Sequence, residues 1–305
     1  MVNGIINVYK EKGYTSFDVV AKLRGIFHQK KIGHTGTLDP DAQGVLPVCL
    51  GKATRVCDLL TDKDKVYKAV LLLGQETDTQ DISGQVLNQA EVNVTEQAVY
   101  DAISQFIGRQ KQVPPMYSAL KVNGKKLYEL ARAGKEVERQ ARHVDLPAIE
   151  ILEIKFPVVK FRVECSKGTY IRSLCADIGE KLRCGGTMQS LVRTRVGEFR
   201  LADALTLAQL QELRDTERLE EALLPTDRIF SDFPMLHVEE KWRKLIDNGN
   251  AFYPGQTVEQ TTHPAGEWVR IYREDDSFVG IYAYDETKEW YKPVKVFPSN
   301  TESRK

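Results

Sequence analysis

Apolar positions along the chain recur at the spacings of both strands and helices. Short apolar runs predict strands over residues 4–9, 66–73, 148–156, 158–165 and 187–199, and a further apolar run covers residues 45–50. Apolar residues three and four positions apart predict helices over residues 17–28, 96–107, 126–133, 169–182 and 206–224. The two kinds of element do not alternate strictly, so their order favours an α+β or mixed-sheet fold over a doubly wound one.

Local signals predict where two of these helices begin. Ser16 stands in position to cap the first helix, and Asp18 in its first turn complements the positive end of the helix dipole. Thr95 is in position to cap the second helix, whose apolar stripe ends at Gly108. The stripe predicted to be buried in the first helix consists of Phe17, Val20, Leu23 and Phe27.

The pattern changes after about residue 229. Short strand-like runs over residues 268–272, 278–284 and 291–296 are separated by Asn, Gly, Pro and Asp. They predict a small β-rich, barrel-like module, which divides the chain into domains at residues 1–228 and 229–305. The polar tail over residues 298–305 is expected to be disordered.

Composition narrows the class of protein. Of the 305 residues, 42% are hydrophobic and 28% charged, which is typical of a soluble globular protein. No apolar stretch is long enough to predict a membrane span, and the N-terminus lacks the basic start and apolar core of a signal peptide. The five cysteines form no Cys-x-x-Cys pair and the five histidines show no metal-ligand spacing. We therefore expect reduced thiols, no bound metal and a cytoplasmic protein.

Charge is balanced overall but unevenly distributed. Lys and Arg together number 43, as do Asp and Glu. Between Arg109 and Arg142, nine Lys or Arg stand against three Glu, whereas residues 201–235 carry eight Asp or Glu against three Arg. The basic segment indicates either a face that binds a polyanion or a solvated helix surface.

The segment over residues 33–44, GHTGTLDPDAQG, has the composition of a functional loop. It is polar, punctuated by glycine and lies between two apolar elements, which is a usual place for chemistry. Asp39 precedes a proline, so its backbone is held out of the helical region. Taken alone, the segment also fits a simple turn in which an aspartate bonds its own backbone. A phosphate-binding P-loop is excluded, because no Ser or Thr follows Gly51-Lys52 and Gly44 lies too far upstream.

Several blocks of the chain resemble, in the same order, the bacterial tRNA pseudouridine synthase B family. The first runs from Gly33 through Asp39 to Arg55, and the others lie at residues 65–69, 114–121 and 167–174. The resemblance covers residues 3–200 most closely. It implies a pseudouridine synthase fold, with a mixed, largely antiparallel sheet flanked by helices, and a C-terminal RNA-binding module of the PUA type.

The resemblance also implies a reaction, the isomerisation of uridine 55 to pseudouridine in the T loop of tRNA without a cofactor. The base must leave the RNA stack before its glycosidic bond can be broken. Asp39 would be the nucleophile or general base, Arg172 its cationic partner, and Tyr67 the aromatic ring beneath the base. The family pattern does not decide whether the aspartate adds covalently or removes a ribose proton.

Further residues match positions near the substrate in the family. His34 matches a histidine that helps to extrude the base, Leu191 an apolar residue that closes over it, and Lys10 a lysine near the site. Glu11 follows Lys10 where the family has proline, which predicts a less rigid loop. The other predicted substrate-binding residues are Gly36, Thr37, Leu38 and Tyr170.

The basic segment is expected to bind the backbone of the tRNA T arm in a salt-dependent way. The residues assigned to this contact are Lys121, Lys125, Lys126, Arg132 and Arg142. No extended apolar interface is indicated, so we expect a monomer. An enzyme and a non-catalytic tRNA-folding factor would share this surface, and Asp39 favours the enzyme, because a carboxylate aimed at RNA repels its phosphates.

Overall fold

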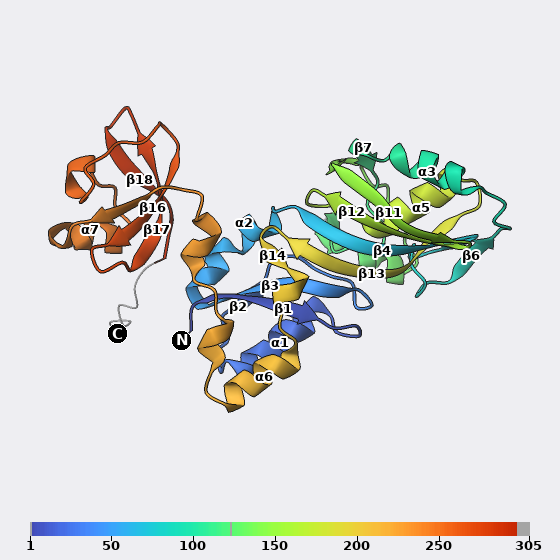
Figure 1. Ribbon diagram of the computed structural model, residues 1–305, viewed down its shortest axis with the longest axis horizontal. Coiled ribbons are helices and arrows are strands. Elements are labelled where there is room, and N and C mark those ends of the chain that lie inside the picture. Colours follow the sequence, from blue (N-terminus) through green and yellow to red (C-terminus); the bar gives the residue numbers. More distant parts are fainter. Residues whose placement is uncertain (1, 123, 298–305) are drawn as a thin grey trace.

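The computed structural model describes residues 2–122 and 124–297, and its main feature is an eight-stranded sheet. Six strands follow the order β1-β3-β13-β4-β12-β11, while β2 pairs with β3 and β14 with β13 (Figure 1). The strands are β1 (Gly4–Lys10), β2 (Ile32–His34), β3 (Gln43–Leu50), β4 (Lys65–Leu73), β11 (Ala148–Lys155), β12 (Val158–Cys165), β13 (Gly186–Val196) and β14 (Phe199–Arg200). Each pairing is antiparallel except that of β13 with β3. The predicted α+β class, with a mixed and largely antiparallel sheet, is confirmed.

Helices pack on this sheet in two groups (Figure 1). The α-helices among the described residues are α1 (Ser16–Ile26), α2 (Cys57–Thr61), α3 (Glu96–Ser104), α4 (Leu127–Arg132), α5 (Ile171–Lys181), α6 (Leu207–Asp215) and α7 (Arg243–Asp247), of which α7 packs in the C-terminal unit instead. One core joins α1 and α6 to β1 and β3 around Leu23 and Leu210. A second joins α3 and α5 to β4, β12 and β11 around Phe161 and Ile178. Side chains along β3 alternate between the first core and a third one on its other face, so nearly the whole strand is buried.

The start of α1 differs from the prediction. Thr15, not Ser16, is the cap: Thr15 Oγ1 accepts the Asp18 N–H at 3.0 Å, and Asp18 Oδ2 accepts the Thr15 N–H at 2.8 Å. The Ser16 hydroxyl instead accepts the Leu38 N–H at 2.9 Å. Phe17 is 62% exposed and was wrongly placed in the buried stripe, because the helix buries the face that begins at Ser16.

Three other predicted boundaries are wrong. The helix predicted over residues 206–224 ends at Asp215, because Glu217 adopts a positive φ of 57°. The strand predicted over residues 187–199 is interrupted at Gly197, after which β14 folds back and pairs with β13. The helix predicted from residue 169 begins at Ile171, which leaves Tyr170 at its N-terminal cap position.

Three two-stranded sheets were not predicted. They are β5 (Gln75–Thr77) with β6 (Val86–Gln89), β7 (Gly108–Gln112) with β10 (Arg142–Leu146), and β8 (Lys121–Val122) with β9 (Lys125–Lys126). Most of their residues are polar, so they lack the apolar alternation that predicts a strand. Long-range backbone pairing produces them instead. The segment over residues 33–44 is likewise not entirely a loop, since His34 belongs to β2 and Gln43 begins β3.

The C-terminal part is a strand-rich unit with a sheet of its own, drawn in orange and red at one end of the molecule in Figure 1. Its sheet has the order β15-β16-β17-β18, and in the described residues its strand order does not close into a barrel. The strands are β15 (Met235–Val238), β16 (Trp268–Arg273), β17 (Phe278–Asp285) and β18 (Trp290–Val296), of which the last three were predicted. An ion pair between Lys295 and Asp58 in α2, at 2.8 Å, joins this unit to the rest. The disorder predicted for residues 298–305 lies outside the described residues.

No helix within the described ranges is long and apolar enough to cross a bilayer.

Candidate active site

Asp39 and Arg172, 133 positions apart in the chain, meet as an ion pair. Asp39 lies in the turn between β2 and β3, and Arg172 lies in the first turn of α5. Arg172 Nε is 3.0 Å from Asp39 Oδ2, and Nη2 donates to Oδ1 at 3.3 Å. The arginine side chain is 7% exposed and the aspartate side chain 37%. The guanidinium is therefore buried in the protein, while part of the carboxylate remains accessible to solvent.

Backbone carbonyls and a second carboxylate hold Arg172 in place. Its Nη1 donates to the Thr79 carbonyl at 3.1 Å, and its Nη2 to the Tyr117 carbonyl at 2.8 Å. Asp81 Oδ2 lies 3.6 Å from Nη1, and Asp81 itself accepts the Thr79 hydroxyl at 2.7 Å. The sequence analysis assigned no role to Asp81 or Tyr117, although Tyr117 belongs to a block that resembles the family. These acceptors leave the guanidinium little freedom to turn away from Asp39.

The surroundings of Asp39 make it a stronger base than an ordinary aspartate. Burial raises the pKa of the Asp39 carboxyl, and the nearby Asp81 raises it further. The guanidinium of Arg172 lowers the same pKa, as expected for a cationic partner, but burial is the larger effect. An open, partly desolvated carboxylate with a fixed cation beside it can act either as a nucleophile or as a general base.

Tyr67 and Leu191 lie on adjacent strands of the sheet next to this ion pair. Tyr67 is in β4 and Leu191 in β13, where the antiparallel register places Leu191 opposite Ala69. Both side chains are buried in one apolar cluster, which also contains Leu38 from the Asp39 turn. Burial raises the pKa of the Tyr67 hydroxyl, with Asp39 a smaller contributor, so this phenol is neutral at neutral pH.

Lys10 stabilises the Asp39 turn by donating hydrogen bonds to backbone carbonyl groups. The side chain is fully buried, and Nζ donates to Ala42 O at 2.6 Å, Pro40 O at 3.1 Å and Glu11 O at 3.2 Å. Burial lowers the pKa of Lys10 to about 8, against the attraction of Asp39. The lysine therefore cross-links the end of β1 to the turn, even though Glu11 stands where a more rigid proline was expected.

The other predicted residues of the turn have different environments. His34 Nδ1 accepts the Gly36 N–H at 3.3 Å, and burial lowers the pKa of His34, so its ring is neutral at neutral pH. Leu38 is buried, whereas Thr37 is exposed. Tyr170, at the start of α5, is half-buried.

Tyr170 fixes the start of α5 to β7. Its N–H donates to Gln112 Oε1 at 2.8 Å, and its carbonyl accepts Gln112 Nε2 at 3.0 Å. This two-way bond ties the helix that carries Arg172 to a strand that the sequence analysis did not find. Burial raises the pKa of the Tyr170 hydroxyl.

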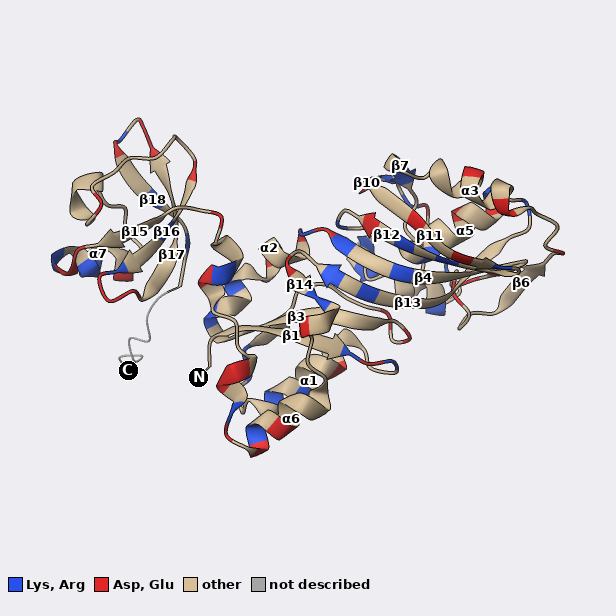
Figure 2. Cartoon of the chain, viewed as in Figure 1, with Lys and Arg blue, Asp and Glu red and all other residues tan. Residues whose placement is uncertain are grey.

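The predicted RNA-contacting residues are mostly exposed around the β8-β9 hairpin and α4. Lys126 Nζ and the Arg132 guanidinium lie over the Tyr128 ring at 5.3 and 5.6 Å. The segment leading into the hairpin includes Tyr117, whose carbonyl contacts Arg172, so the basic hairpin is attached directly to the ion pair. Arg142 is exposed on β10. Figure 2 shows further Lys and Arg along β13, β4 and β12.

The described part of the chain contains no cluster of three or more His, Cys, Asp or Glu residues that could hold a metal ion. The functional groups that the structure brings together in this region are the Asp39 carboxylate, the Arg172 guanidinium and the buried Tyr67 phenol.

Sequence comparisons match the chain to one family. Residues 24–171 match the N-terminal domain of the TruB family pseudouridylate synthases, and residues 172–231 match the C-terminal domain of tRNA pseudouridylate synthase B. The tRNA pseudouridine synthase B of Lachnoclostridium phytofermentans is 54% identical over 97% of this chain and 100% of its own length. That of Alkaliphilus oremlandii is 48% identical over 92% of each chain.

Solved structures show the same fold. An H/ACA RNP bound to a substrate RNA containing 2′-deoxyuridine includes a chain that superposes with a TM-score of 0.72 at 26% identity, covering 98% of this chain and 86% of that one. A chain of a Cbf5-Nop10-Gar1 complex superposes with a TM-score of 0.71 at 29% identity, covering 97% and 85%. The fold is thus that of a pseudouridine synthase, which is an isomerase. The chain belongs to the TruB family.

Proposed function

We propose that the protein converts uridine 55 in the T loop of tRNA to pseudouridine. The relatives reported above are named as tRNA pseudouridine synthases, and they match this chain over nearly its full length. The single observation that carries the proposal is the pairing of Asp39 with the buried Arg172. It gives a fixed, partly open carboxylate at the place where the chain most resembles the family.

The reaction begins when the target uridine leaves the RNA stack and enters the site. The Tyr67 ring lies beneath the base, and Leu191 packs against its other face. Asp39 acts on the ribose, either by attack on C1′ or by removal of a proton, and the bond between N1 and C1′ breaks. The base then turns and rejoins C1′ through C5. C5 gives up its proton and N1 gains one by exchange with solvent, so the product is an isomer of uridine and no redox cofactor is needed.

The turn and the basic hairpin have separate tasks in this proposal. His34, neutral and half-buried, takes the place vacated by the uridine in the T loop, and Gly36, Thr37, Leu38 and Tyr170 shape the entrance. The backbone of the T arm lies along the exposed cations of the hairpin region, so binding weakens as salt increases. These cations are Lys121, Lys125, Lys126, Arg132 and Arg142.

We propose further that residues 1–228 form the catalytic domain and residues 229–305 an RNA-binding module of the PUA type. The protein acts as a monomer in the cytoplasm. The strand-rich C-terminal unit, with its own apolar core around Val269 and Tyr282, supports the division.

Incubation of the purified protein with an unmodified tRNA transcript, followed by pseudouridine mapping at single-nucleotide resolution, tests the proposal. We expect one new pseudouridine, at position 55, from the wild type and none from Asp39→Asn. Asp41→Asn is the matched control, because Asp41 lies in the same turn but is 62% exposed and forms its ion pair with the exposed Lys12. Modification at another position would refute the target, and full activity of Asp39→Asn would refute the mechanism.

A further inference from the structure

A second arginine, Arg193 in β13, is buried beneath the Asp39 turn. It is 2% exposed, and the sequence analysis gave it no role. Its Nε donates to the Val45 carbonyl at 2.7 Å, and its Nη2 to the Gly36 carbonyl at 3.2 Å. Gly36 precedes Asp39 in the chain and Val45 follows it. One guanidinium therefore ties both limbs of the turn to the centre of the sheet.

The same guanidinium also faces Tyr67. The antiparallel register places Arg193 directly opposite Tyr67 across β13 and β4. Arg193 is close enough to lower the pKa of the Tyr67 hydroxyl, against the burial that raises it. Gly36 packs against the guanidinium, since a Cβ there would lie 3.7 Å from Arg193 Nη1, an ordinary van der Waals contact.

The charge of Arg193 has no carboxylate partner among residues 2–122 and 124–297 that would compensate it. The positive charge of Arg193 lowers the pKa values of its ionisable neighbours Lys10, His34 and Lys65. A buried charge without a counter-ion is unfavourable, so such an arrangement is expected mainly where function requires it. Arg172 and Arg195, by contrast, both pair with carboxylates.

We infer that Arg193 is a positioning residue for pseudouridine formation: it fixes the Asp39 turn and the Tyr67 hydroxyl in place and keeps the floor of the site electropositive. This inference rests on the proposed function. When the bond between N1 and C1′ breaks, the electron pair remains on N1, so the detached base carries negative charge. A fixed cation near that base favours this state without any proton transfer.

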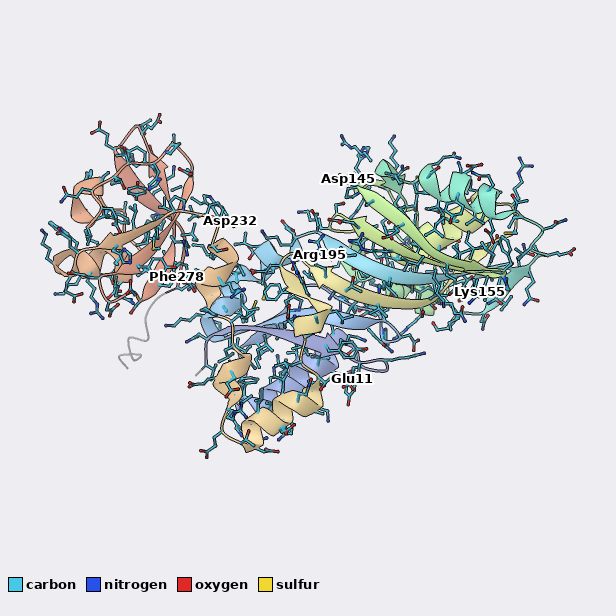
Figure 3. The ribbon with its side chains drawn as sticks, viewed as in Figure 1. Glu11, Asp145, Lys155, Arg195, Asp232 and Phe278 are labelled. Atoms are coloured by element: carbon cyan, nitrogen blue, oxygen red, sulfur yellow. The ribbon has the colours of Figure 1, made fainter. Side chains whose placement is uncertain are left out.

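Arg193→Gln and Arg193→Lys test the inference on a tRNA transcript under single-turnover conditions with saturating protein. Gln keeps hydrogen-bond donors but removes the charge, whereas Lys keeps the charge. We expect a rate at least 100-fold lower for Gln and about 2- to 10-fold lower for Lys, because Lys keeps the charge but loses the paired guanidinium hydrogen bonds, with tRNA dissociation constants within threefold of wild type. Arg195→Gln is the matched control, because Arg195, labelled in Figure 3, lies on the same strand but pairs with Glu164.

Amide hydrogen exchange over residues 36–45 reports the position of the turn independently of activity. We expect faster exchange there in Arg193→Gln than in wild type or Arg195→Gln. Circular dichroism shows whether Arg193→Gln folds. If it does not, Arg193→Lys is compared with wild type in the same two assays. A rate within twofold of wild type together with unchanged hydrogen exchange would then overturn the inference. A rate for Arg193→Gln within threefold of wild type, or a loss explained wholly by weaker binding, would also overturn it. No product from the wild type would refute the proposed function itself, and this inference with it.

Discussion

Replacing Arg172 by Met removes the cation that Asp39 and Asp81 share. At 3.0 Å and an effective dielectric constant of about 20, two unit charges attract each other by about 5 kcal/mol. Because Asp39 is 37% exposed, screening by water leaves about 2 kcal/mol of this, and the two backbone carbonyls that lose their donor add about 1 kcal/mol. We expect Arg172→Met to lower the free energy of unfolding by about 3 kcal/mol. Arg172→Lys, which keeps the charge, should lower it by about 1 kcal/mol.

The same change has a predictable effect on pH dependence. Arg172 opposes the burial that raises the pKa of Asp39, so its removal raises that pKa further. In the proposed reaction Asp39 acts in its ionised form, so the acid limb of the single-turnover rate should move to higher pH. A carboxyl whose pKa is raised by folding also destabilises the native state as pH rises through its two pKa values. The decline in stability towards neutral pH should accordingly be steeper in Arg172→Met than in wild type.

Urea unfolding followed by far-ultraviolet circular dichroism measures these stabilities. Tryptophan fluorescence would not serve, because the three tryptophans, at positions 242, 268 and 290, all lie in the C-terminal unit. Arg218→Met is the control, since Arg218 forms an ion pair with Glu221 in which both side chains are more than half exposed, and we expect it to leave the free energy of unfolding nearly unchanged. The reasoning is refuted if Arg172→Met matches Arg218→Met in stability, or if its acid limb coincides with that of wild type.

Three further predictions concern the turn and the basic hairpin. Gly44→Ala should lower the free energy of unfolding by at least about 3 kcal/mol in urea unfolding, because Gly44 has a φ of +109° and an added Cβ would lie 2.2 Å from the Arg193 carbonyl oxygen. Gly25→Ala is the control, since an added Cβ there meets open space and should leave stability unchanged or slightly higher. Folding lowers the pKa of Lys10 from 10.5 to about 8, so between these pH values the unfolded chain binds more protons than the native state. Wild-type stability should therefore rise with pH by roughly 3 kcal/mol relative to Lys10→Met, and parallel pH curves would contradict this. Lys125→Gln should weaken tRNA binding and reduce the slope of log Kd against log salt by about 0.7–0.9, and an unchanged slope would remove Lys125 from the phosphate contacts.

The sequence by itself determined the elements whose signals are local. Strands β1, β4, β11 and β12 were predicted from their short apolar runs. Their apolar residues lie on covered faces of the sheet, so the apolar pattern in the sequence follows the geometry of the strand. The Thr95 cap and the Asp39 turn were also visible, because a cap and an Asp-Pro pair act on neighbouring residues only. The resemblance then paired Asp39 with Arg172, although nothing in their spacing brings them together.

Only the tertiary structure decided which partners each site residue meets. Asp81 and Arg193 escaped the sequence analysis because their significance lies in contacts with distant segments: Arg172 reaches the Thr79 carbonyl across 93 positions, and Arg193 reaches the Val45 carbonyl across 148. The polar strands β7 and β10 were missed for the same reason. Their backbone groups pair with each other across a long stretch of the chain, and no local sequence pattern predicts this pairing. Chain topology brings these segments together, and the burial and charge that tune Asp39 exist only once the sheet has formed.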